Sequence, residues 1–489
     1  MIIRKEFSIV NIIRSTVMLK FAKQILFLII LVFTFIVVYL GNFNAPFFGD
    51  EGYFYLPTII KLNEIGFNLK PGVIDAELTR GHPLLVQNLA ALWINMFNNL
   101  QMGIHSFAFL ISILLIISIY YVVSELFGIS EARIAVVLLC MQSIFVVQST
   151  LLQLEVPLTL CTIWVIYFYF KKRILNYTII GVVMVLVKET GLIIIFSLFL
   201  HQLLNYKSYS SKIELLKEIT WCSLPALVAL LYFIYQYTIT GWLFFPEHIG
   251  NFELSQNVFY DKLKNYFSLV FIYYNRNFLA IAALVIIAYL GYKRKLNFSQ
   301  QQQKTIKTLS LIVLTYLVFC ASNFMASRYI FVLCVLYIVF ISMILVKVLA
   351  HNRMYFIILV IVYIPLQLRS FAKHRPPNDI SFGYYDDIEV GKQMVKFVED
   401  SLNKKSIIYS DYSERLYLSE HYFGYLSHET RYSTTKYIDS CDVAIIKCYK
   451  TKNDALVNEI LKRNRWSLLK TVTFNTISYK IIGDESVKL

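Results

Sequence analysis

Charged residues are scarce in this sequence: Asp, Glu, Lys and Arg make up 16% of its 489 residues, whereas hydrophobic residues make up 57%. A soluble chain of this length could not bury so much apolar surface, which predicts a polytopic α-helical membrane protein. The net charge of +15 would in another setting suggest nucleic-acid binding. Here Lys and Arg fall between apolar runs, where they orient helices in a membrane, so we expect no nucleic-acid partner.

Cysteine motifs are also lacking. The seven Cys residues show neither a CxxC pair nor metal-ligand spacing, and five of them lie inside apolar runs, where they behave as small hydrophobic residues. Cys441 and Cys448 lie an odd number of residues apart on or beside one predicted strand. Their side chains should therefore point to opposite faces, and we do not expect them to pair with each other.

The apolar runs predict the membrane topology. Residues 25–41 follow five basic residues and precede no small-residue cleavage site, which indicates an uncleaved first span with a cytoplasmic N-terminus. Further spans are predicted at 105–127, 132–150, 156–170, 174–187, 190–204, 219–240, 267–292, 305–320, 329–348 and 354–370, about eleven in all. The run 84–97 is too short and too polar to span, and we expect a juxtamembrane helix there.

Basic loops support this count. When 84–97 is left out, the four basic segments at 171–173, 207–217, 293–307 and 347–353 all fall on the cytoplasmic side, whereas including it inverts every one. The chain is then a multi-pass cell-membrane protein with an extracytoplasmic C-terminus. The same parity gathers ionisable residues on the outer side: Asp50, Glu51, Arg80, His82, Glu155, Lys188, Glu189, Glu247, His248 and Arg328.

Ionisable groups near membrane depth are costly unless they line a hydrated cavity or find partners, so this set is a candidate site, although any single member could be a loop charge. A carboxylate at a cavity mouth can accept the proton of an acceptor hydroxyl, while cations hold an anionic leaving group. Lys188 and Arg328 suit a lipid phosphate. His248 could help as a hydrogen-bond donor or as a partial cation.

Six segments carry a family resemblance: Asp50-Glu51 with aromatics after it, Gly81-His82-Pro83-Leu84, Leu154-Glu155-Val156-Pro157-Leu158, Lys188-Glu189-Thr190-Gly191, Phe244-Phe245-Pro246-Glu247-His248-Ile249 and Ser327-Arg328-Tyr329. In this order and on one predicted face, they resemble the GT-C superfamily of polyprenyl-phosphate-sugar-dependent glycosyltransferases. Within it, they are similar to the protein O-mannosyltransferase and aminoarabinose (lipid A) transferase branch. No segment is specific alone.

The resemblance implies roles for single residues. Asp50 would be the catalytic base, Glu51 a neighbour that positions it or shapes its pKa, and Glu155 a further acid of the catalytic group. The implied substrate-binding residues are His82, Lys188, His248, Arg328 and Tyr329. The implied donor is a polyprenyl-phosphate sugar, and the acceptor could be a lipid, a glycan or a protein.

Three positions depart from the family pattern: Glu155 stands where Asp is usual, one Pro follows His82, and Tyr53 replaces an Arg often found after the acidic pair. A longer acid changes reach, and the missing Arg removes a cation near the base. Asp50 and Glu155 could together hold a divalent ion, although the branch is not expected to need one. We therefore expect no certain cofactor and no metal ligands.

The chain divides into a predicted membrane domain, 1–372, with an outer loop 42–104 that carries juxtamembrane helices, and a C-terminal domain, 373–489. Strands are predicted at 406–410 and 443–448, and one or two more at 472–482. With amphipathic helices predicted at 388–402 and 453–464, this suggests a small extracytoplasmic α/β domain. Because it has no phosphate loop, triad spacing or metal cluster, we expect a cap that covers the cavity or helps to position the acceptor.

Two other functions stay open. A transporter or lipid-linked glycan flippase would also carry outer charges, but transporters commonly have two similar halves, and no internal repeat is visible here. A ligase or polymerase that moves a whole glycan from a lipid pyrophosphate is also compatible with the sequence.

Overall fold

A computed structural model describes residues 22–38, 40–253, 255–295, 297–323, 325–373, 375–427, 431–449, 453–464 and 466–487. The chain forms two compact units, Met1–Phe43 and Asn44–Leu489. In the first unit, an apolar helix runs from Ala22 to Val38. Of the five basic residues on which the predicted cytoplasmic N-terminus rests, four come before Ala22 and lie outside the described residues.

Within the described ranges, five helical segments are long and apolar enough to cross a membrane. They are α5 (Leu100–Leu126), α11 (Lys212–Thr240), α15 (Gln300–Ser322), the 3-10 turn η4 (Ser327–Ile330) with α16 (Phe331–His351), and α17 (Arg353–Lys373). Shorter apolar helices are α4 (Leu85–Ile94), α8 (Glu155–Phe170), α9 (Ile174–Val187) and α10 (Gly191–Leu204). The chain is a multi-pass membrane protein, and the count of about eleven spans stays a prediction.

Two predicted spans are interrupted, so their prediction as single helices was wrong. Residues 132–150 form α6 (Ile129–Cys140) and α7 (Ser143–Gln148), while 267–292 include α13 (Gln256–Phe271) and α14 (Arg276–Tyr292), which meet at 77°. The buried Arg276 side chain joins the two breaks, because it donates to Gln142 Oε1 at 3.1 Å. Hydrophobicity alone does not reveal such a junction.

Short elements on the predicted outer side carry the acidic pair. A π-helical turn η2 (Glu51–Tyr55) leads into α2 (Leu56–Ile65), α3 (Ala76–Thr79) and α4. Gly49 precedes the turn with φ +60°, a left-handed conformation that suits glycine. A further short helix, α12 (Pro246–Gly250), follows α11. The remaining turns are Leu40–Asn44, Tyr206–Ser208, His421–Phe423, Ile438–Ser440 and Glu485–Val487.

The C-terminal part contains a five-stranded sheet of order β2-β1-β3-β5-β4, which confirms the predicted small sheet. The strands are β1 (Ile407–Tyr409), β2 (Ser433–Thr435), β3 (Val443–Tyr449), β4 (Ser467–Phe474) and β5 (Ile477–Gly483). β1 is parallel to β2 and β3, whereas β5 is antiparallel to β3 and β4.

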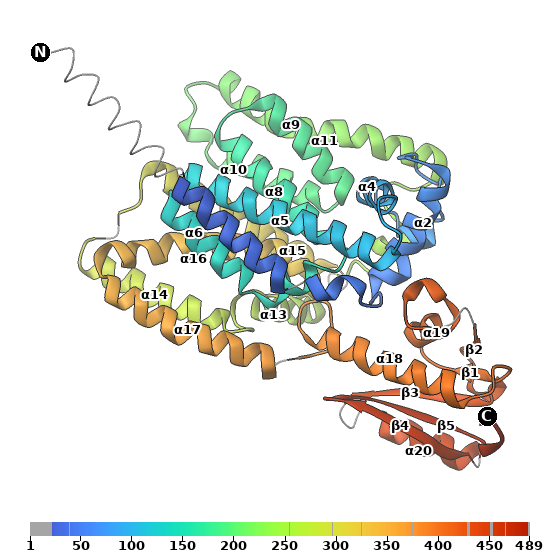
Figure 1. The fold of residues 1–489 in the computed structure, drawn as a ribbon. Coiled ribbons are helices and arrows are strands. Elements are labelled where there is room, and N and C mark those ends of the chain that lie inside the picture. Colours follow the sequence, from blue (N-terminus) through green and yellow to red (C-terminus); the bar gives the residue numbers. More distant parts are fainter. Residues whose placement is uncertain are drawn as a thin grey trace, which may run out of the picture. The chain divides into compact units, whose positions relative to one another are not determined.

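Three helices accompany this sheet: α18 (Gly383–Ser401), α19 (Tyr412–Ser419) and α20 (Asp454–Asn464). Figure 1 shows α18 and α20 on opposite faces of it. Val457 and Ile460 of α20 pack against Ala444, Ile446 and Cys448 of β3, because alternate residues of a strand share one face. No disulfide joins any of the seven Cys residues in the described part of the chain. A domain boundary at 373 stays a prediction.

Candidate active site

The acidic pair divides its two carboxylates between two environments. Asp50 keeps 27% of its side chain exposed, whereas Glu51 is fully buried. Glu51 Oε1 accepts a hydrogen bond from the backbone N–H of Leu152 at 2.6 Å, and its Oε2 lies 3.3 Å from His105 Nε2. Glu51 therefore anchors the loop from within, and Asp50 is the member of the pair that a substrate can reach.

Arg328 is the centre of a group of carboxylates. Its guanidinium donates a hydrogen bond to Asp50 and another to Asp379 Oδ2 at 3.2 Å. Its Nε lies 3.4 Å from Glu155 Oε1. These acids come from the first outer loop, the start of α8 and the segment before α18, so residues far apart in sequence meet at one cation.

Glu155 joins Arg328 to a second cation. Lys188 Nζ donates to Glu155 Oε1 at 2.7 Å, and both side chains are almost completely buried. Lys188 Nζ also lies 4.2 Å from the centre of the Tyr329 ring, on its face, where a cation is attracted by the ring electrons. Lys188 directly follows α9 and Tyr329 lies in η4, so both residues stand at helix ends.

A His–Glu pair lies beside the Lys188–Glu155 pair. His82 Nδ1 is 2.9 Å from Glu189 Oε2, and the rings of His82 and His248 are 5.3 Å apart. Burial would raise the pKa of Glu189, but the charge and hydrogen bond of His82 lower it to about 2. Burial, reinforced by His82, lowers the pKa of His248 to about 4. His248 is therefore neutral at pH 7, with one ring nitrogen able to donate a hydrogen bond and the other able to accept one.

Arg80 and Glu247 form a third pair, with Arg80 Nη1 2.8 Å from Glu247 Oε2. The Arg80 guanidinium also lies over the rings of Phe54 and Phe245, 5.0 and 5.6 Å from their centres. Both charged side chains are partly exposed. The pair thus ties α12 to the outer loop at the edge of the site.

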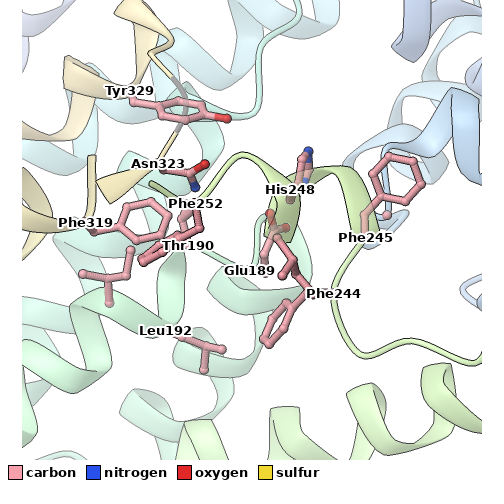
Figure 2. Close-up of a pocket in the computed structure, with 13 residues that line it drawn as sticks. Glu189, Thr190, Leu192, Phe244, Phe245, His248, Phe252, Phe319, Asn323 and Tyr329 are labelled. Atoms are coloured by element: carbon pink, nitrogen blue, oxygen red, sulfur yellow. The ribbon is translucent and has the colours of Figure 1, made fainter. Parts of the chain in front are cut away.

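An apolar cavity of about 410 Å³ opens beside these groups. Figure 2 shows Tyr329, Asn323 and His248 toward one end of it and Leu192 toward the other. The wall is mostly hydrophobic, with Phe244, Phe252 and Phe319 among its lining residues. A cavity with apolar walls and a few polar groups at one end fits an amphipathic ligand with a polar head.

The structure brings together most of the residues predicted for the site. Asp50, Glu155, Lys188, Arg328 and Tyr329 form one connected cluster. His82 and His248 lie together beside it. The described hydrogen bonds of Glu51 go to His105 and Leu152 instead of to this cluster, so Glu51 supports the loop.

Sequence reasoning missed Asp379 and His105. Asp379 follows the turn-rich stretch after α17, and no local pattern marks it as a partner of Arg328. Burial raises the pKa of Asp379, and Arg328 opposes that rise. His105 lies near the N-terminal end of α5, where an ionisable residue in a predicted span was the available signal.

A metal centre finds no support in the described part of the chain, where no group of three His, Cys, Asp or Glu residues is placed to hold an ion. Asp50 and Glu155, which could have shared one, are instead joined through Arg328.

Comparison with known proteins finds a family model that matches part of the chain and solved structures that share its fold. Residues 81–237 match the family model of dolichyl-phosphate-mannose-protein mannosyltransferase. The fold is similar to the crystal structure of ArnT from Cupriavidus metallidurans bound to undecaprenyl phosphate, with a TM-score of 0.53 and 12% identity over 97% of this chain and 99% of that one. The apo state of the same ArnT gives a TM-score of 0.51 at 12% identity, over 93% and 98% of the two chains.

An oligosaccharyltransferase from Archaeoglobus fulgidus in its apo form gives a TM-score of 0.47 at 12% identity, over 84% of this chain and 64% of that one. No curated protein matches the sequence. At this identity, the likeness to ArnT shows a common fold over nearly the whole chain.

Proposed function

We propose that this chain, a member of the GT-C superfamily of glycosyltransferases, transfers a sugar from a polyprenyl-phosphate donor to an acceptor nucleophile on the extracytoplasmic face of the cell membrane. One observation carries the proposal. A single guanidinium, that of Arg328, links a solvent-accessible carboxylate to a buried Lys–Glu pair, and an apolar cavity adjoins them at Tyr329. A base, phosphate ligands and a lipid site are thereby within reach of one another.

The cavity suits the carrier lipid. Its hydrophobic lining would take isoprenoid units next to the phosphate, while Tyr329, Asn323 and His248 face the polar head. The ArnT structure of similar fold holds undecaprenyl phosphate, which supports a donor of this class. The hydrophobic tail explains why such an enzyme would need its site at membrane depth.

Arg328 and Lys188 are the proposed phosphate ligands. Arginine offers a planar fork to phosphate oxygens, and lysine offers a point charge. Both cations form ion pairs with carboxylates, Lys188 with Glu155 and Arg328 with Asp50, Glu155 and Asp379. An incoming phosphate would therefore displace a carboxylate from Arg328, and Asp50 is the most exposed of the three.

Asp50 is then the proposed general base. It accepts the proton of the acceptor hydroxyl as that oxygen bonds to the anomeric carbon of the sugar. The bond from the same carbon to the phosphate oxygen breaks, and its electron pair leaves with the polyprenyl phosphate. Arg328 and Lys188 stabilise the negative charge that develops there. Neutral His248 can donate a further hydrogen bond to the phosphate.

Glu155 is the proposed contact for the donor sugar. Its Oε2 atom is buried and has no hydrogen-bond partner among the described residues, although Oε1 is held by Lys188. A buried carboxylate oxygen without a donor is costly. A sugar hydroxyl at that point would satisfy it.

The test is transfer by isolated membranes supplied with radiolabelled polyprenyl-phosphate sugars, with the label followed into lipid, glycan and protein fractions. We expect Asp50→Asn to abolish transfer while donor binding persists. Asp400→Asn, which changes an exposed acid near the end of α18, is the matched control and should retain full activity. Undiminished transfer by Asp50→Asn would remove the base assignment. Label that crosses the membrane without joining an acceptor would favour a flippase.

A further inference from the structure

We propose that the C-terminal part of the chain is a positioning element of the active site, because it clamps the loop that carries Asp50. This loop, residues 47–53, is called here the acidic loop. The positioning residues are Phe423, Ser413 and Tyr384. The proposal rests on the proposed function in taking Asp50 as the reacting group. It gives the C-terminal part a different role from the cap expected from the sequence, which would only cover the cavity or help to position the acceptor.

The acidic loop has one anchor on its inner side. Glu51 accepts a hydrogen bond from Leu152 N and lies against His105. Asp50 itself is bound through Arg328, which the donor phosphate is proposed to take over. Once the phosphate has replaced Asp50 on Arg328, the Asp50 side chain loses this partner. The remaining contacts of the loop then decide where its carboxylate stands.

Phe423 supplies the first outer contact. The backbone N–H of Phe47 donates to the carbonyl of Phe423 at 3.0 Å. The Phe423 ring also covers Gly52 so closely that a Cβ atom at that glycine would overlap it. Gly52 and Phe423 are both buried. The absence of a side chain at Gly52 thus allows the C-terminal part to contact the loop backbone directly.

Tyr53 supplies the second outer contact. Its hydroxyl donates a hydrogen bond to Ser413, and its ring meets the Tyr412 ring edge-on at 5.4 Å. Burial raises the pKa of the Tyr53 phenol, opposed by the bond to Ser413, so the phenol stays a neutral donor. This Tyr stands where the family often has Arg, and it links the loop to α19.

The clamp is itself fixed to the sheet. Glu414, next to Ser413, is buried and accepts a hydrogen bond from the Tyr479 hydroxyl of β5 at 2.6 Å. It also lies 3.7 Å from Lys447 Nζ of β3, whose ammonium pairs with Asp387 of α18 at 2.6 Å. These bonds join α18, α19 and both strands. A buried network whose polar groups are bonded to one another restricts the motion of the elements it joins, so the groups that contact the acidic loop are themselves held in place.

Tyr384 completes the grip at the other end of the loop. Its ring packs on Phe48 at 5.7 Å, and its hydroxyl lies 3.3 Å from Thr150 Oγ1. Tyr384 is buried and lies in the first turn of α18, the helix whose Asp387 pairs with Lys447. The acidic loop is therefore contacted at Phe47, Phe48, Gly52 and Tyr53, on both sides of Asp50.

The test follows amide hydrogen exchange of the full-length protein in nanodiscs, together with donor-saturation kinetics. Three variants weaken the clamp: Tyr53→Phe, Gly52→Ala and Phe423→Leu. We expect faster exchange across residues 47–55 with unchanged protection of β3 and β5. We also expect kcat to fall about fivefold for Tyr53→Phe and about a hundredfold for Gly52→Ala, with the donor KM unchanged. Tyr437→Phe, which alters an exposed ring, is the control.

Each outcome decides something different. Unchanged exchange of the loop in Gly52→Ala and Tyr53→Phe would overturn the clamp, whatever the kinetics. Faster exchange in a protein whose wild-type form transfers no sugar would overturn the proposed function and leave the clamp standing. If Phe423→Leu also exposes β3 and β5, that variant has unfolded the sheet, and the two loop variants carry the decision. Loss of donor binding in Tyr53→Phe would contradict a role confined to Asp50.

Discussion

Replacing Glu155 by Gln should destabilise the protein more than any comparable change at its surface. The Glu155 and Lys188 side chains are 1% and 2% exposed, and Lys188 Nζ lies 2.7 Å from Glu155 Oε1. In Glu155→Gln, Arg328 keeps Asp50 and Asp379. Lys188 loses its only described ion-pair partner, which leaves a buried cation without a counter-charge. Removal of one partner of a buried pair costs about 3 to 5 kcal/mol.

The double variant Glu155→Gln/Lys188→Met separates stability from function. Removing the cation as well should restore most of the loss, because a buried pair is often replaced by apolar groups at little cost. The expected coupling between the two changes is thus about 2 kcal/mol or more. The restored protein should nevertheless bind donor weakly, since Met cannot contact the phosphate.

The assay is unfolding in mixed micelles by titration with a denaturing detergent, followed by tryptophan fluorescence. Glu125→Gln is the control: Glu125 pairs with Lys171 at 3.1 Å, but the two side chains are 43% and 36% exposed, so the loss should stay below about 1 kcal/mol. Two results would contradict a stabilising pair between Glu155 and Lys188. One is a stability loss in Glu155→Gln no larger than in this control, and the other is a loss in the double variant larger than the summed losses of the two single variants.

Three further predictions concern the same cluster. Asp379→Asn frees one position on Arg328 that a phosphate would otherwise have to compete for, so the donor Kd measured by binding titration should fall several-fold, and a rise would contradict competition. Arg328→Lys should weaken donor binding nearly as much as Arg328→Ala, because a lysine cannot reproduce the fork that reaches Asp50 and Asp379 together; full retention by Lys would show that charge alone matters. Stability should fall as the pH drops from 6.5 toward 4, because the unfolded chain binds a proton at His248 that the folded protein, with a pKa of about 4, does not. Below pH 4.5 the loss of stability should continue through Glu189, whose carboxylate keeps its charge in the folded protein until about pH 2. His248→Gln should remove the part of the pH dependence above pH 4.5, about 1 to 2 kcal/mol after allowance for partial exposure. An unchanged pH dependence in this variant would exclude His248 as its source.

The sequence predicts several helices of the membrane part to within one residue. α9 begins and ends at the predicted residues, and α8 and α10 differ from their predictions by one residue each at the N-terminal end. Lys171 and Lys188 bound the apolar runs that form these helices. The free energy of membrane insertion is a sum over the residues of each segment, so the local sequence determines where such a helix begins and ends. The strands β1 and β3 were likewise marked by short apolar stretches between polar residues.

Contacts between distant segments are a different matter. The motifs nominate Asp50, Glu155, Lys188 and Arg328 by residue type, but nothing in their spacing says that Arg328 bonds Asp50 and Asp379 at once. The breaks after α6 and α13 are likewise hidden, because Gln142 and Arg276 meet only after both helices have packed. The bonds from Tyr53 to Ser413 and from Phe47 to Phe423 cross more than three hundred residues.

Membrane insertion is governed by the composition of each segment, so the chain alone settles that this is a multi-pass protein with charged groups at the ends of its helices. Which charges neutralise which depends on distances of a few ångströms between segments, and the energy of a buried pair changes steeply over that range. Packing therefore decided that Asp50 stays partly exposed, that Glu51 is an internal anchor, and that Phe423 of the C-terminal part contacts the loop carrying them both.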